Sequence, residues 1–368
     1  MSPSTLSKVL ALATLSIAVV SAQDPTEAFP PGVTGKFPAT PLASKTYAYP
    51  TGVPYKVDTD VGLLRGNQFG FNQCNSTTEN QNSDCQTSFI NSIDGKFDFC
   101  LWAPSKPGST VADQEGEMVA WCTKPGRGTR LIPQYALQGV QFMKTSDYVQ
   151  VVGFIDQRLI NLDAADYGGE MDPHGADLRG NPMGGLVYSQ AYNGQWTQVI
   201  EWHNFMGGNF FCFKACDPSR PNAAQYCQHI YDRIGCAYNA PNNAQNGTFE
   251  TCEGENQDFP GVYTENGAVM TYTQPPESLG AITTMPYTAR IPASSNCVTH
   301  TSSVLYTGLP TPTIDVVAAS ASGASASGSR TGSAAGSKST GSSPNGASTI
   351  ELSSVGILGV IFSALFLA

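Results

Sequence analysis

The stretch CQHIYDRIGC, which runs from Cys227 to Cys236, sets two cysteines around a histidine, an aspartate and an arginine. These residue types can bind a metal ion or transfer protons. The apolar residues recur at the spacing of one helix face, Asn222 can serve as the N-cap, and Gly235 lies where a left-handed C-cap is needed. We therefore expect one short helix over about residues 222–235.

A helix would keep His229 away from the cysteine that precedes it. With 3.6 residues per turn, His229 lies about 200° around the helix from Cys227, so the two side chains cannot bind one metal ion. His229 would instead share a solvated row with Gln225 and Arg233. The pattern favours a helix pinned by disulfides over a zinc site.

A second group of ionisable residues lies in NLDAADYGGEMDPHGADLRG. Oxygen ligands on a loop turned by glycine and proline could hold Ca²⁺ weakly, although the D-x-D-x-D-G run of an EF-hand is missing. A solvated acidic loop is the simpler interpretation. The calcium candidates, which surround His174, are Asp163, Asp166, Glu170, Asp172 and Asp177.

Other catalytic patterns are missing from the sequence. No G-x-S-x-G, H-E-x-x-H or G-x-G-x-x-G occurs, and no pattern predicts a cofactor. A glycosidase needs only two suitably spaced carboxylates and leaves no short motif, so this class stays open. Glu201, beside Trp202 and His203 in IEWHNF, is the first residue that we would substitute. An exposed strand carboxylate beside a packed tryptophan would give the same pattern.

The elements that would position these residues are predicted mainly as strands. From about residue 60 to 306, short β-branched and aromatic runs alternate with turn residues. YVQVVGFI (148–155) can pair with GVQFM (139–143), and Asn193-Gly194 separates two further runs. Gly207-Gly208-Asn209 leads into FFCF, and AVMTYT and AITTMPYTARI supply later strands. The runs predict a mainly β fold, an antiparallel sandwich or barrel-like structure, as one domain or two.

The cysteines indicate an oxidising compartment. An even number in a secreted chain usually forms disulfides, here five, and pairing within the two sequence groups is the simplest arrangement. The sequence does not determine the connectivity. The ten cysteines are Cys74, Cys85, Cys100, Cys122, Cys212, Cys216, Cys227, Cys236, Cys252 and Cys297. Asn75 and Asn246 lie in N-x-[ST] sequons and are predicted to carry N-linked sugars on surface loops.

The sequences at both ends of the chain have the patterns of targeting segments. Residues 1–22 have one positive charge, an apolar run and small residues before Ala22, which indicates a signal peptide rather than a buried helix. Residues 346–368 end in VGILGVIFSALFLA, the pattern of a GPI-attachment signal, with a tail-end membrane helix as the alternative. We expect the lipid on Asn345, or else on Ser342 or Ser343.

Three further segments are expected between these ends. Residues 23–56 are rich in proline and aromatics, which predicts an extended arm that is either free or laid over the domain as a strap. Residues 57–306 form the disulfide-rich ectodomain, with one or two subdomains. Residues 307–345 are rich in Ser, Gly and Ala, which predicts a disordered linker or an O-glycosylated stalk.

Four motifs, taken together, resemble those of a known group of proteins. GGNFFCFKACDP, YCQHIYDRIGCAYNAP, GTFETCEGENQDFPGVYTENG and DPHGADLRGNPMGGLVYS resemble the fungal, mostly basidiomycete, glycoproteins called macrophage-activating glycoproteins. The resemblance covers most of residues 60–300, together with the signal peptide, stalk and anchor tail. It implies a cell-surface or wall glycoprotein, and it implies no reaction, cofactor or catalytic residue.

Charge and composition restrict the classes of partner that the chain is expected to bind. The formal net charge is −10 and no basic run occurs, so nucleic acid is excluded as an expected partner. We expect an extracellular chain, held at the plasma membrane or cell wall by its lipid anchor, with a non-enzymatic structural or interaction role. The alternatives are a carbohydrate-binding module, whose exposed aromatics would stack on wall polysaccharide or other surface glycans, and a glycan-active hydrolase.

Overall fold

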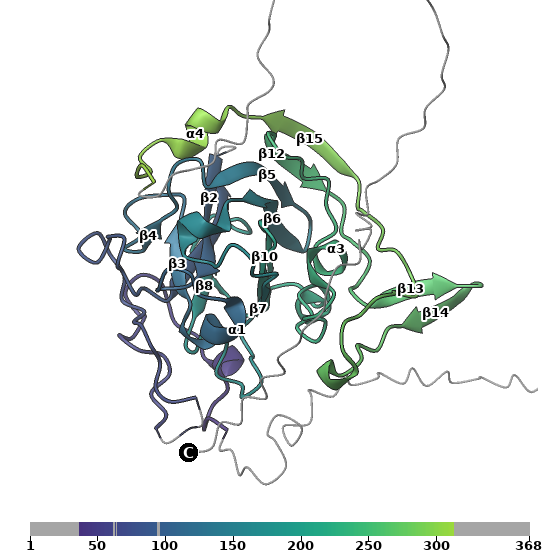
Figure 1. Ribbon diagram of the computed structural model, residues 1–368, viewed down its shortest axis with the longest axis horizontal. Coiled ribbons are helices and arrows are strands. Elements are labelled where there is room, and N and C mark those ends of the chain that lie inside the picture. Colours follow the sequence, from purple (N-terminus) through teal and green to yellow (C-terminus); the bar gives the residue numbers. More distant parts are fainter. Residues whose placement is uncertain (1–36, 62, 64, 94–95, 313–368) are drawn as a thin grey trace, which may run out of the picture. The chain divides into compact units, whose positions relative to one another are not determined.

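The computed structural model describes residues 37–61, 63, 65–93 and 96–312 (Figure 1). Within these residues the fold is mainly β, as predicted, with two large sheets and a separate hairpin. The six-stranded sheet has, in order, β4 (Arg130–Leu131), β3 (Val119–Cys122), β2 (Lys96–Ala103), β1 (Thr87–Ile93), β8 (Leu186–Ser189) and β9 (Thr197–Val199). The seven-stranded sheet has β15 (Ser294–Thr299), β12 (Phe249–Gly254), β5 (Leu137–Lys144), β6 (Tyr148–Ile155), β11 (Phe210–Cys216), β10 (Trp202–Gly207) and β7 (Gly169–Met171). The hairpin pairs β13 (Val262–Glu265) with β14 (Ala268–Thr271).

Most neighbouring strands are antiparallel. The predicted hairpin of β5 and β6 is present, with Val140 opposite Gly153. The hairpins β8/β9 and β10/β11 are also present, the latter through a turn in which Gly208 and Asn209 have φ near +60°. Three pairs are parallel instead, β1/β8, β5/β12 and β3/β4, so the sheets are mixed at these places.

The two large sheets pack face to face around one main core. Trp102 of β2 lies 5.9 Å from Trp202 of β10, measured between ring centroids, and Phe99 lies 6.0 Å from Phe211. The backbone N–H of Trp102 also donates to Oδ1 of Asn204 at 2.8 Å. Alternate residues of β10 and β11 fill this core, so the residues between them face the opposite side of the sheet. That opposite side carries the candidate site.

Helices are short throughout the described part. The α-helices are α1 (Val111–Gln114), α2 (Ala223–Tyr226), α3 (Gly235–Asn239) and α4 (Ser302–Tyr306). The 3₁₀ helices are η2 (Leu42–Ser44), η3 (Glu115–Glu117), η4 (Gln157–Ile160) and η5 (Glu277–Leu279). The longest of these has five residues, so packing between sheets rather than helix propensity stabilises the fold.

The single helix predicted over 222–235 is wrong in its extent. Asn222 precedes α2 without a side-chain capping bond, α2 ends at Tyr226, and residues 227–234 form turns before α3. Two disulfides explain the break, because both partner cysteines are on β11, four residues apart and therefore on one face of the sheet. Cys227 and Cys236 would point about 180° apart on a continuous helix, so the segment must leave the helix to reach both partners. Gly235, expected to end the helix, begins α3 with φ +58°.

A second correction concerns AITTMPYTARI, residues 281–291, which we expected to form a strand. These residues have no strand pairing and are mostly exposed. Thr288, Ala289 and Ile291 lie along the edge of a cleft. A β-branched run without a neighbouring strand edge stays irregular, because the propensity reflects packing on a sheet.

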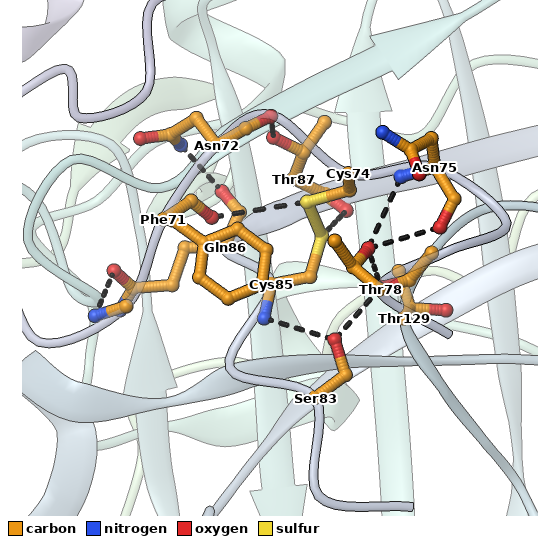
Figure 2. The surroundings of a disulfide bond; sticks show 12 residues. Phe71, Asn72, Cys74, Asn75, Thr78, Ser83, Cys85, Gln86, Thr87 and Thr129 are labelled. Carbon is orange, nitrogen blue, oxygen red and sulfur yellow. Dashed lines mark hydrogen bonds between the residues drawn. A yellow bond between two sulfur atoms is a disulfide. The ribbon is translucent and has the colours of Figure 1, made fainter. Parts of the chain in front are cut away.

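All ten cysteines lie in the described part and none is free. The five disulfides are Cys74–Cys85, Cys100–Cys122, Cys212–Cys236, Cys216–Cys227 and Cys252–Cys297. Every pair lies within one of the two sequence groups. Figure 2 shows the first disulfide beside Asn75, which is exposed on a turn held by hydrogen bonds with Thr78. Asn246 is exposed as well, so both sequons are accessible, and their glycosylation stays a prediction.

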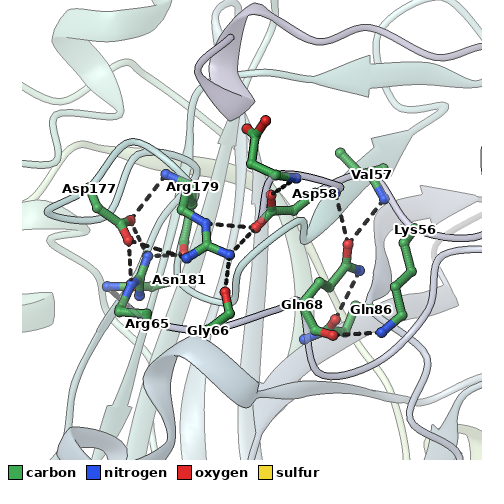
Figure 3. A network of polar contacts seen from close by, with 12 residues as sticks. Lys56, Val57, Asp58, Arg65, Gly66, Gln68, Gln86, Asp177, Arg179 and Asn181 are labelled. Atoms are coloured by element: carbon green, nitrogen blue, oxygen red, sulfur yellow. Dashed lines mark hydrogen bonds and ion pairs between the residues drawn. The ribbon is translucent and has the colours of Figure 1, made fainter. Parts of the chain in front are cut away.

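Residues 37–61 lie over the sandwich. Tyr49 packs edge to face on Phe89 and Trp196, and Val53 and Val57 join the main core. The described end of the proline-rich segment is thus a strap. Figure 3 shows the polar network that fixes its continuation, in which Arg179 Nε donates to Asp58 Oδ2 at 2.7 Å.

No helix in the described ranges is long and apolar enough to cross a membrane. The predicted signal peptide, anchor tail, Asn345 and most of the stalk lie outside the described residues.

Candidate functional site

A cleft of about 1650 Å³ lies on the side of the seven-stranded sheet that faces away from the main core. Its floor includes Glu170 of β7 with Phe205 of β10 and Phe210 of β11. Residues 229–238, which follow the Cys216–Cys227 disulfide, form one wall, and residues 271–277, which begin at the last residue of β14, form another. The disulfides therefore hold a turn-rich segment over the sheet and leave a hollow beside it.

Five carboxyl groups line this cleft: Glu277 of η5, and four others that interact with one another electrostatically. Glu170 comes from β7, Asp172 follows it, Glu115 comes from η3, and Asp232 comes from the segment between α2 and α3. Burial raises the pKa of all four above their ordinary values. Repulsion from the charges of the others adds to the effect at Glu115 and Glu170. A group of acids that hold protons unusually well is characteristic of functional sites.

Glu115 is the acid with a pKa close to neutrality. Burial, with the charges of Asp172 and Asp232, raises the pKa of Glu115 to about 7, while Arg65 and a hydrogen bond from Asn181 act against the rise. Arg65 cannot neutralise the cleft alone, because its guanidinium is also bound to Asp177, to the Asn181 side chain and to the Gly180 carbonyl. The cleft therefore stays acidic and partly protonated.

Glu170 is enclosed beside His203. The two side chains are almost fully buried on neighbouring strands, with His203 Nδ1 3.8 Å from Glu170 Oε1. Burial, with the nearby Lys214, lowers the pKa of His203 well below its ordinary value. Burial raises the pKa of Glu170 well above its ordinary value. Both shifts favour the neutral forms, and after burial the charge of Asp232 contributes most to the raised pKa of Glu170.

Next to the carboxyl groups lie two histidines and a glutamate. The ring of His174 stacks on the ring of His229, with centroids 3.7 Å apart, and His174 Nε2 lies 3.2 Å from Glu201 Oε2. One ligand atom from each of the three residues lies within 4.8 Å of the others. All three are half-buried. We call these residues the His–Glu–His triad.

The two histidines of the triad have opposite pKa shifts. For His174, burial lowers the pKa, but the hydrogen bond and charge of Glu201, together with the charge of Asp172, outweigh it and raise the pKa. For His229, burial and the adjacent His174 lower the pKa to about 4. An imidazole whose neutral form is favoured therefore lies against one whose charged form is favoured.

The structure separates most of the calcium candidates. Asp163 and Asp166 accept backbone N–H bonds within their own loop and from Val111, and Asp177 pairs with Arg65. None of the five candidates belongs to a group of close ligand atoms among the described residues. Glu170 and Asp172 join the cleft instead. The calcium hypothesis itself stays a prediction.

Sequence reasoning placed His229 wrongly and missed Glu115 and Asp232. His229 does not share a solvated row with Gln225 and Arg233, because the expected helix ends before it. It lies half-buried against His174. Glu201, the first residue that we would substitute, is half-buried in the triad and is not the exposed strand carboxylate of the alternative interpretation. The signal for Asp232 was the ionisable content of CQHIYDRIGC, and Glu115 had no local signal.

The fold and the cleft together define a class of protein: a disulfide-rich β sandwich with an acidic, histidine-bearing cleft. Comparison with known proteins gives a family. The chain is 46% identical over 223 residues to the appressorium protein ROW2 of Mycosarcoma maydis, covering 74% of that protein and 59% of this chain. It is 50% identical over 199 residues to the appressorium protein ROW1 of the same fungus, covering 46% of that protein and 53% of this chain. The chain belongs to the family of these basidiomycete proteins.

Other comparisons gave no match. No protein-family profile matches the chain, and no solved structure matches it. The chain spans about three quarters of ROW2 and less than half of ROW1.

Proposed function

We propose that this chain is a fungal cell-surface glycoprotein whose cleft binds a neutral or cationic glycan. The names of its relatives associate them with the appressorium, and the predicted signal peptide, sequons and anchor tail are consistent with display at the surface. Membership of the macrophage-activating glycoproteins, suggested by the sequence motifs, is part of this proposal. The observation that carries the proposal is the acidic cleft with an exposed aromatic ring at its edge.

That ring belongs to Tyr167, which is 91% exposed and lines the cleft. A large exposed aromatic residue beside a cleft can stack on a ligand. The tryptophans are not placed to stack on a ligand in the cleft. Trp102, Trp121 and Trp202 are buried in the core, and Trp196 packs against it. The sugar-stacking surface is therefore expected on tyrosine.

Charge and size restrict the ligand. Carboxyl groups accept hydrogen bonds from sugar hydroxyls or from an ammonium group, and those that are ionised repel phosphates and uronic acids. Arg233 also lines the cleft, but its guanidinium donates to the carbonyls of Pro275 and Gly280. The volume exceeds the roughly 300–1,000 Å³ of pockets for single small molecules. An extended, neutral or amino-sugar chain fits these conditions.

The test is calorimetric titration of the secreted chain with oligomers of glucosamine, N-acetylglucosamine, β-glucan and galacturonic acid. We expect a neutral or cationic oligomer to bind and the galacturonic acid oligomer to fail. Tyr167→Ala should weaken binding at least about tenfold, a loss of about 1.4 kcal/mol. Tyr55→Ala is the matched control, because Tyr55 is also exposed but stacks on Phe71 away from the cleft. Strongest binding of the acidic oligomer, or equal binding by both variants, would refute the proposal.

Hydrolysis of the same glycan is the second candidate. Glu115, whose pKa is about 7, lines the cleft together with other carboxyl groups, and glycosidases combine a protonated acid with a second carboxylate. Release of reducing ends by the native chain, abolished in Glu115→Gln while the oligomer still binds, would establish it. Binding without release would leave the chain a binding protein.

A further inference from the structure

The His–Glu–His triad has a geometry that the glycan proposal does not use. We propose that His174, Glu201 and His229 bind one divalent transition-metal ion, with zinc as the metal to test. Two imidazoles and one carboxylate are a ligand set found in zinc sites that keep an open fourth position. Because His229 also lines the cleft, the open position would be reached from the cleft.

The distances allow this with small side-chain movements. Ligand atoms at about 2.1 Å from a tetrahedral zinc ion are roughly 3.4 Å from one another. The triad atoms all lie within 4.8 Å of each other, and His174 Nε2 is already 3.2 Å from Glu201 Oε2. The two imidazole rings are stacked with only 15° between their planes, so at least one ring must turn about its side-chain bonds before both lone pairs point at one ion.

A different interaction holds the chain at each of the three ligand residues. Asp172 Oδ1 accepts the backbone N–H of His174 at 2.7 Å and that of Gly175 at 2.8 Å, which fixes the loop after β7. The carbonyl of Glu201 accepts the N–H of Cys216 at 3.0 Å. The disulfide from that same Cys216 reaches Cys227, two residues before His229.

Cys216 therefore links two of the three ligands through one residue. Its N–H positions Glu201 and its sulfur positions the segment that carries His229. A site whose ligands are oriented before the metal arrives loses less conformational entropy on binding. This arrangement distinguishes the triad from the other close group in the described residues, Glu250 with Cys252 and Cys297, whose sulfurs are joined in a disulfide.

The chain supplies its own control. It has four histidines, and His300 lies outside the triad, half-buried, with its Nε2 2.9 Å from the Thr251 hydroxyl. His300→Gln changes the same residue type at a site without a second histidine. A chain that binds zinc through scattered histidines would respond equally to every variant.

The experiment measures zinc binding by the full secreted chain after removal of metal with EDTA. We expect one zinc per chain by calorimetry and a rise in Tm of at least about 3 °C with saturating zinc. His174→Gln, His229→Gln and Glu201→Gln should each weaken binding more than tenfold, while His300→Gln should leave it within twofold. Absence of binding by the native chain, or equal affinity in the triad variants, would overturn the proposal.

A measurement on the native chain tests the proposal even if the variants fail to fold. Cu²⁺ loaded at one equivalent should give an electron paramagnetic resonance spectrum with coupling to two imidazole nitrogens. Coupling to one nitrogen or none would overturn the proposal. The result is independent of glycan binding, because Tyr167→Ala should bind zinc as the native chain does.

Discussion

Glu115 shows how a single residue in the cleft couples function to pH. Its pKa is about 7 in the folded chain, against an ordinary value of 4.5, chiefly because of burial. Between these pH values the folded chain holds a proton that the unfolded chain has released. The free energy of unfolding contributed by Glu115 therefore falls as the pH rises from about 4.5 to about 7, and it is constant above that. The same direction applies to Glu170, Asp172 and Asp232, whose pKa values are also raised.

Glu115→Gln should remove this part of the pH dependence. Between pH 4.5 and pH 8, the variant should gain about 1–3 kcal/mol of unfolding free energy relative to the native chain, because glutamine has no charge to bury. Urea unfolding at both pH values measures the difference. Glu117→Gln is the control, because Glu117 is in the same 3₁₀ helix but its side chain is 41% exposed. A change in the control as large as in Glu115→Gln would contradict this account.

At the scale of the element, the segment 227–236 shows a disulfide overriding helix propensity. The sequence has helical periodicity, yet the covalent bonds from Cys212 and Cys216 require both ends to reach one face of β11. Breaking the helix leaves His229 and Asp232 beside the sheet, where they join residues of β7 and its loop. The element that looked like a pinned helix is thus a wall of the cleft.

Two disulfides of equal loop length separate stability from site formation. Cys216–Cys227 and Cys74–Cys85 both have a sequence separation of 11, so the loop-entropy model assigns about 3 kcal/mol to each. Replacing either pair by alanine should lower the unfolding free energy by a similar amount. The 216/227 variant alone should lose more than tenfold in zinc affinity, measured by calorimetry below its Tm. Equal zinc affinity in both variants would show that the disulfide does not position the triad.

Over the whole described part, a buried ionic network joins the N-terminal strap to the loop after β7. Asp58 and Arg179 are both almost fully buried, with 3% and 1% of their side chains exposed. Arg179 also donates to the Gly66 carbonyl and lies 3.8 Å from Asp177 (Figure 3). The loop that carries Asp172 and His174 is therefore fixed from its far side by residues more than a hundred positions away.

Asp58→Asn should destabilise the chain by about 3–5 kcal/mol, because it leaves the Arg179 guanidinium buried without its main counter-charge. Asp258→Asn should cost less than about 1 kcal/mol, since the Arg290–Asp258 pair has side chains 49% and 59% exposed. Urea unfolding at one pH measures both changes in unfolding free energy. If Asp58→Asn lowered the unfolding free energy no more than Asp258→Asn does, the buried network would not be energetically important.

The sequence alone determined the features that depend on local chemistry. Period-two patterns and glycine or asparagine turns identified the hairpins β5/β6, β8/β9 and β10/β11, because turn geometry and side-chain alternation involve neighbouring residues. The grouping of the cysteines likewise separated the disulfides into two sets. The parallel pairs had no such local signal, and the β-branched run at 281–291 gave a misleading one.

The tertiary structure alone decided the site. Glu115, His174, Glu201 and Asp232 come from separate turns and short helices, and sequence distance sets no limit on which of them meet. They converge because β7 lies beside β10 and β10 beside β11, and because disulfides from β11 draw the segment 227–236 back over that edge of the sheet. Strand order and covalent closure act over long stretches of chain, whereas periodicity reports only on the nearest turns, so the cleft could be found only in the folded molecule.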